Sequence, residues 1–167
     1  LTTDRMKEYP SDGQHLRDAF GISGVLNTEI EQSDASKGFA NLCECGITDN
    51  SHKYPAHLIR EGVAWAQKSL PLGPIYIHCH AGGGRSAAFA YAVLRGAKNL
   101  SCEDALIAIR NGKDWKYLYE GRICLGSITE YPRLNWGDEG LASHDTIEIV
   151  ERALSSTISE KTQRKGP

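Results

Sequence analysis

A cysteine and an arginine six positions apart are the residues of this sequence best suited to chemistry. The segment that joins Cys79 to Arg85 contains three consecutive glycines, Gly82, Gly83 and Gly84. Glycines have no Cβ and tolerate positive φ angles, so the backbone N–H groups of such a segment can point into one small space. The pattern predicts a loop that binds an anion and stabilises the anionic form of the Cys79 thiol.

The flanking residues place this loop between a strand and a helix. Residues 75–77 are apolar and follow a Gly-Pro turn, which indicates a short buried strand. Residues 87–94 are rich in alanine and other apolar residues, which favours a helix. The N–H groups and the dipole of a helix N-terminus attract anions. Cys79 would attack a bound phosphorus atom while the Arg85 guanidinium holds the phosphate oxygens. The plainer alternative is a tightly packed turn with a structural cysteine.

Residues 78–86 read His-Cys-His-Ala-Gly-Gly-Gly-Arg-Ser. This segment resembles the signature HC-x-AG-x-x-R-[ST] of the cysteine-dependent protein tyrosine phosphatases, and the chain is similar in size to their dual-specificity branch. The resemblance covers about residues 16–110. It implies a phosphatase-like fold and hydrolysis of phosphate monoesters on proteins, on phosphotyrosine and also on phosphoserine or phosphothreonine, through a phosphocysteine. It assigns phosphate binding to His80, Ala81, Gly82, Gly83, Gly84 and Arg85.

The resemblance also implies a general acid, an aspartate on a loop about thirty residues before the cysteine. Asp49 lies thirty positions before Cys79, after a predicted strand and before a predicted helix. That position places it at the sheet edge where open α/β sheets bind ligands. The alternative is that Asp49 only caps the turn at 48–51, and Asp34 is then the next candidate for the acid.

Three further residues of the signature have expected roles. His78 should hydrogen-bond the backbone and hold the loop instead of transferring a proton. Ser86 can donate to the sulfur when the intermediate breaks, although a serine at a helix N-terminus is also a common cap. His80 is expected on the rim of the loop, where it could touch substrate.

The composition is that of an ordinary soluble protein. The 167 residues carry a net charge of −2, with 40% hydrophobic and 24% charged residues. These values favour a single domain over 1–167, with a core at about 16–112, an extension at 113–160 and a frayed tail at 161–167. The charge argues against binding to nucleic acid or membrane, and no signal peptide is recognised. We expect a cytoplasmic or nuclear protein with a phosphoprotein partner and no cofactor, and the oligomeric state stays open.

The five cysteines are odd in number and irregularly spaced, which fits a reducing compartment. Cys43 and Cys45 form a close pair, but the sequence has no second pair of cysteines or histidines nearby, so we expect no zinc or other metal site. In some relatives a cysteine on the neighbouring strand forms a reversible disulfide with the nucleophile. Cys43 or Cys45 could do so with Cys79, but simple packing of two buried cysteines is the favoured interpretation.

The rest of the chain alternates between strand and helix patterns. We expect a short helix at 13–20, strands at 22–26 and within 39–47, a helix from Pro55 to Leu70, and a helix from Ser101 with a capping box at Asp104. This order predicts an α/β fold with a central, mainly parallel sheet and helices on both faces.

The C-terminal part departs from the expected family pattern. Residues 114–125 alternate around Glu120-Gly121 and indicate a β-hairpin. Residues 122–127 resemble the strand that normally opens such domains, and we expect them to fill that sheet edge. A final helix should begin at Asp145, with an apolar stripe of Ile147, Val150, Leu154 and Ile158.

Other functions are compatible with the same loop. A phosphoinositide or an RNA 5′-phosphate could replace the phosphoprotein, although the loop has no lysine, which weakens a lipid assignment. A weakly active module that binds phosphorylated residues would not need the thiol. A sulfurtransferase would use a cysteine in a similar loop, but its chemistry does not require Arg85.

Overall fold

The computed structural model describes residues 17–18, 20–48, 54–80, 84–111 and 144–163. Its strands and helices, in chain order, are β1 (Gly24–Glu29), the 3-10 helix η1 (Ala35–Lys37), β2 (Leu42–Ile47), α3 (Ala56–Ser69), the 3-10 helix η2 (Leu70–Leu72), β3 (Ile75–His78), α4 (Arg85–Gly96), α5 (Cys102–Asn111) and α8 (His144–Gln163). None of the described helices is long and apolar enough to cross a membrane.

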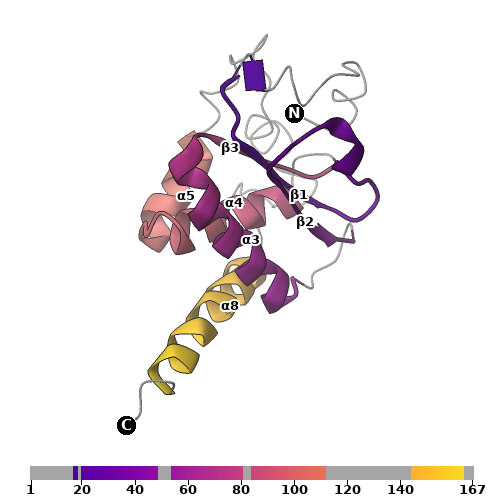
Figure 1. The fold of residues 1–167 in the computed structure, drawn as a ribbon. Coiled ribbons are helices and arrows are strands. Elements are labelled where there is room, and N and C mark those ends of the chain that lie inside the picture. The colour runs from indigo at the N-terminus through magenta and orange to yellow at the C-terminus, as the bar shows by residue number, and fades with distance from the viewer. Residues whose placement is uncertain (1–16, 19, 49–53, 81–83, 112–143, 164–167) are drawn as a thin grey trace.

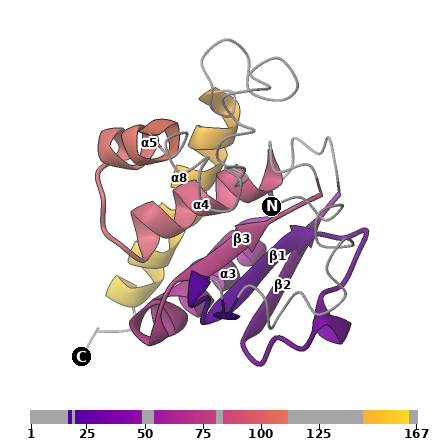
Figure 2. The ribbon, with the colours of Figure 1, turned by 90° about the horizontal axis from the view of Figure 1, so that it is seen from above.

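The three strands form a parallel sheet in the order β2-β1-β3, as Figure 2 shows. Leu26 of β1 pairs with Cys43 of β2 on one side and with Ile77 of β3 on the other. The strands are parallel, so their carboxyl ends meet at one edge of the sheet. The predicted parallel sheet is confirmed. Strand β1 was predicted at 22–26 and is observed at Gly24–Glu29, so it begins two residues later and ends three residues later than predicted.

One face of the sheet is covered by the long helices (Figures 1 and 2). Helix α3 packs on β2, and α4 packs on β1 and β3, while α8 contacts both helices from outside. Side chains at alternate strand positions point to this face, and they form the main core with Ile59 of α3 and Phe89 of α4. A Cβ on Gly62 would lie 3.0 Å from the Phe89 ring, so glycine lets α3 and α4 approach each other closely.

The second face carries a smaller cluster in which Val25 and Tyr76 pack against Phe20 and Phe39. The helical residues 17, 18 and 20 are followed by Gly21, which has φ +63° and donates its N–H to the Arg17 carbonyl at 2.8 Å. This is the expected glycine stop of the short first helix. The flanking helices of the predicted α/β fold are therefore present, with the long ones on one face and short turns on the other.

The later helices agree with the sequence pattern. The N–H of Asp104 donates to Ser101 Oγ at 3.0 Å, which confirms the capping box of α5. Helix α8 begins one residue before the expected Asp145, and it buries Val150. The predicted hairpin at 114–125 and the predicted edge strand at 122–127 lie outside the described residues.

An ion pair with a tyrosine attaches α8 to α4. Arg95 Nε and Nη2 donate to the two carboxylate oxygens of Glu151 at 2.5 and 2.9 Å, and the Tyr91 hydroxyl donates to Oε1 at 2.6 Å. The hydrogen bonds from Arg95 lower the pKa of Glu151 against the opposing effect of burial, and that from Tyr91 adds to them. The Glu151 carboxylate is therefore ionised at neutral pH.

Candidate active site

The Cys79 thiol lies at the junction of β3 and α4. Strand β3 ends at His78, and Cys79 follows directly, with 2% of its surface exposed. Helix α4 begins at Arg85, and the Ala88 N–H donates to the Gly84 carbonyl at 3.1 Å, which closes the first helical turn. Cys79 Sγ lies 3.3 Å from Ser86 Oγ, within hydrogen-bonding distance. The structure thus confirms the predicted strand and helix and brings Cys79 and Ser86 together.

Some residues of the predicted site lie outside the described residues. They are Asp49, the predicted general acid, and Ala81, Gly82 and Gly83 of the phosphate-binding segment. Their roles stay predictions.

Arg85 is held at the carboxyl edge of the sheet. Its Nη1 donates to the Ile47 carbonyl at 2.7 Å and to Glu31 Oε2 at 2.6 Å, and only 4% of the side chain is exposed. The end of β2 and the segment after β1 therefore fix the position of the guanidinium. The contact of Glu31 with Arg85 was not predicted from the sequence. The sequence shows only that Glu31 is an acidic residue shortly after a predicted strand.

His78 is buried on the opposite face of the sheet from Cys79. Its Nε2 makes a short hydrogen bond with Asp34 Oδ2, and its carbonyl accepts the Thr28 hydroxyl at 2.7 Å. Burial alone would raise the pKa of Asp34, but the hydrogen bond and the charge of His78, together with Lys37, lower it below its ordinary value. The sequence offered Asp34 as a second candidate for the general acid. Because its carboxylate is buried, ionised and bound to His78, we assign it instead to holding His78.

His80, the next residue of the loop, is partly exposed. Its Nδ1 lies 3.5 Å from Oε2 of Glu29, and 44% of the imidazole side chain is accessible, whereas the Glu29 side chain is fully buried. The expected role of His80 on the rim of the loop stays a prediction, because residues 81–83 lie outside the described residues.

Solved structures with similar folds were found. The crystal structure of PTPMT1 superposes with a TM-score of 0.61 at 19% identity, covering 92% of this chain and 89% of that chain. Human DUSP28 gives 0.62 at 12% identity, covering 91% and 90%. Tk-PTP in the active form gives 0.55 at 16% identity, covering 86% of each chain. The chain has the fold of the cysteine-dependent phosphatases. No protein-family model and no curated protein sequence matched it.

Within this fold, the described part of the site brings a thiol, a helix N-terminus and a hydroxyl together. The thiol lies beside the N-terminus of a twelve-residue helix, whose N–H groups and dipole favour an anion. Arg85, which carries the guanidinium, is the first residue of the same helix, and the Ser86 hydroxyl lies next to the Cys79 sulfur. These groups can place a nucleophile, positive charge and a hydrogen-bond donor around one phosphorus atom.

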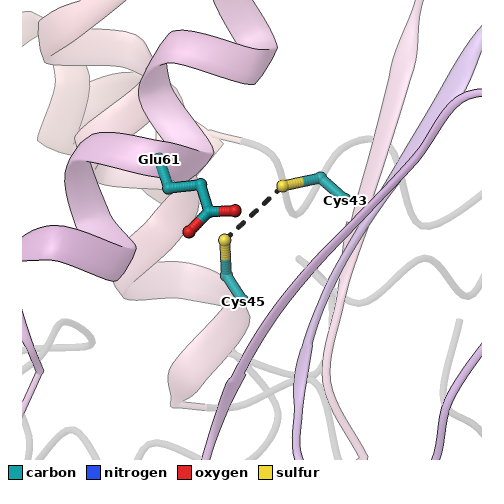
Figure 3. Close-up of side chains that lie close together, drawn as sticks. All are labelled: Cys43, Cys45 and Glu61. Carbon is teal, nitrogen blue, oxygen red and sulfur yellow. Dashed lines mark hydrogen bonds between the residues drawn. The ribbon is translucent and has the colours of Figure 1, made fainter.

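The other cysteines of the sheet lie away from the nucleophile. Cys43 and Cys45 are on β2, while Cys79 follows β3, and β1 lies between these strands. Two strand spacings amount to about 9–10 Å, beyond the roughly 7 Å limit between the Cα atoms of a disulfide. The sheet order therefore argues against the redox bridge to Cys79 that the sequence left open. The sulfurs of Cys43 and Cys45 lie 3.5 Å from each other (Figure 3).

Proposed function

We propose that this protein hydrolyses phosphate monoesters through a phosphocysteine formed on Cys79. The observation that carries the proposal is the position of the Cys79 sulfur, 3.3 Å from Ser86 Oγ at the N-terminus of α4, the helix that begins with Arg85. The fold shared with PTPMT1, DUSP28 and Tk-PTP supports the same conclusion.

The reaction would proceed in two steps. In the first, the Cys79 thiolate attacks phosphorus, the bond to the ester oxygen breaks, and Asp49 gives its proton to that oxygen. Arg85 and the N–H groups of the loop stabilise the equatorial oxygens as charge spreads over them. In the second step, Asp49 takes a proton from water, which attacks phosphorus. The P–S bond breaks, phosphate leaves, and Ser86 donates to the departing thiolate.

For the substrate we propose a phosphoprotein, with phosphotyrosine as the preferred group and phosphoserine or phosphothreonine as further groups. A phosphoinositide is the second candidate, because a structure of PTPMT1 in complex with PI(5)P is among the similar folds. The loop of this chain has histidines and glycines but no lysine, and that composition favours the phosphoprotein.

The basic test is release of nitrophenol from its phosphate ester. Cys79→Ser should lower the rate by roughly a thousandfold or more, since it removes the nucleophile. Cys102→Ser is the matched control, because this thiol is exposed and lies on α5, and its rate should stay at the wild-type value. A Cys79→Ser protein that keeps most of the activity would exclude the phosphocysteine.

The substrate class needs a separate comparison. The ratio of kcat/KM for a phosphotyrosine peptide to that for PI(5)P in mixed micelles should favour the peptide. A preference for PI(5)P would reject the protein substrate and leave the chemistry of Cys79 intact. Trapping from a cell lysate with the Asp49→Ala protein would then identify the physiological substrate.

A further inference from the structure

A second group of reactive side chains lies on the helical side of β2. The Cys43 and Cys45 sulfurs and the Glu61 carboxylate converge there, with ligand atoms that all lie within 4.8 Å of one another, as Figure 3 shows. Both cysteines are buried, whereas Glu61 is exposed. Within the described residues, no lysine, arginine or histidine makes a salt bridge with Glu61.

The local structure explains why these three groups meet. Residues two apart on a strand point to the same face, so both sulfurs of the Cys-x-Cys segment face α3. Glu61 lies on α3 next to Gly62, whose missing side chain allows the close packing of this helix over Leu26 and Phe89. Strand β2 and the helix that follows it in the chain thus supply the three ligands.

The spacing fits a metal ion with sulfur ligands. A Zn²⁺ ion binds thiolates at about 2.3 Å, which puts two sulfurs of a tetrahedral site roughly 3.8 Å apart. The observed Sγ–Sγ distance is 3.5 Å, a difference that a small rotation of either side chain removes. A disulfide would require the same atoms at about 2.05 Å, between residues whose strand geometry holds them apart. Thiolates and carboxylates are both ligand types that Zn²⁺ accepts.

We propose that Cys43, Cys45 and Glu61 form a binding site for a thiophilic divalent metal ion. Zn²⁺ is the ion we expect, with a water molecule as its fourth ligand. The exposed carboxylate gives the ion access from solvent, and each thiol releases its proton to solvent on binding. The sequence argued against a zinc site because it shows no second close pair of ligands. In the structure the third ligand, Glu61, comes from α3. The site is separate from the phosphate-binding loop and does not depend on the proposed reaction.

The ion would also stiffen the end of β2 that holds the active site. Cys45 is two residues before Ile47, whose carbonyl accepts the hydrogen bond of Arg85 at 2.7 Å. Binding at Cys45 would therefore fix the backbone that positions the guanidinium.

The test uses the full chain with Cys79, Cys102 and Cys124 changed to serine, so that Cys43 and Cys45 are the remaining thiols. Titration with Co²⁺ and Cd²⁺ is followed by the thiolate-to-metal charge-transfer absorption. We expect one ion per chain, and loss of the absorption in the further variants Cys43→Ser and Cys45→Ser.

Glu61→Gln keeps the test decisive if a cysteine variant fails to fold, because Glu61 is exposed. Its affinity should fall tenfold or more, on the order seen when groups that support a metal site are removed. Glu44→Gln is the matched control, since Glu44 lies between the two cysteines but its carboxylate accepts the backbone N–H of Asp34 on the other face, and the affinity of this variant for the metal should be unchanged. No charge-transfer band in the starting protein, or equal affinity in Glu61→Gln, would overturn the site.

Discussion

Replacing Asp34 by asparagine tests how much the buried pair with His78 stabilises the end of β3. Both side chains are fully buried, and the amide keeps the shape of the carboxylate while it removes the charge. Net contributions of hydrogen bonds to charged groups are about 1.5–3 kcal/mol. Because asparagine can still accept one hydrogen bond, we expect a loss of about 2–3 kcal/mol in the free energy of unfolding.

The assay is urea unfolding followed by circular dichroism. With a slope of about 2 kcal/mol per molar urea, the expected loss lowers the midpoint by about 1–1.5 M at pH 7. Asp18→Asn is the matched control, because Asp18 is exposed, and its midpoint should move by less than about 0.3 M.

The pH dependence gives the sharper check. The pKa of Asp34 is lowered in the folded protein from its ordinary value of 3.8, so the folded state favours the ionised form. The resulting stability is fully present above pH 3.8 and is lost as the pH falls through the folded pKa. The difference between wild type and Asp34→Asn should therefore shrink in acid. An unchanged midpoint at pH 7, or a difference that stays constant down to pH 2, would refute the reasoning.

Three other substitutions have defined outcomes. Ser86→Ala should slow breakdown of the intermediate, so that a burst of nitrophenol precedes a steady rate roughly tenfold or more below wild type; an unchanged steady rate would make this residue only a cap. Gly62→Ala should cost about 1–3 kcal/mol in urea unfolding, since the new Cβ would lie 3.0 Å from the Phe89 ring, and an unchanged midpoint would contradict the close packing. Glu151→Gln should cost about 1–2 kcal/mol at pH 7 by weakening the contact with Arg95. Because the pKa of Glu151 is lowered from 4.5, its contribution is fully present above pH 4.5 and is lost as the pH falls through the folded pKa, so the urea midpoints of variant and wild type should approach each other as the pH is lowered below 4.5.

Local features of this chain were predictable from the sequence. The short apolar run before Cys79 favours a strand and the alanine-rich run after Ser86 favours a helix, and both elements form there. The Ser101 cap was also predictable, because donor and acceptor lie three residues apart. Such features depend only on neighbours in the sequence.

The contacts that hold the site were not predictable in the same way. Glu31 binds Arg85 across 54 residues of sequence, and Asp34 binds His78 across 44. Both acidic residues lie in a polar segment whose composition indicates only a loop. Which face of the sheet that segment covers depends on packing between distant elements, and no local period records it. The same holds for Glu61, which faces two thiols on a strand that precedes its helix.

The alternation of side chains at the end of β3 separates two environments with different chemical access. The imidazole of His78 is sealed inside one layer of the protein, together with its acidic partner, whereas the neighbouring sulfur belongs to the other layer. Covalent inhibitors aimed at the sulfur would therefore leave the imidazole unmodified. The reactive group of such an inhibitor could therefore be changed without contact to the buried pair of His78 and Asp34.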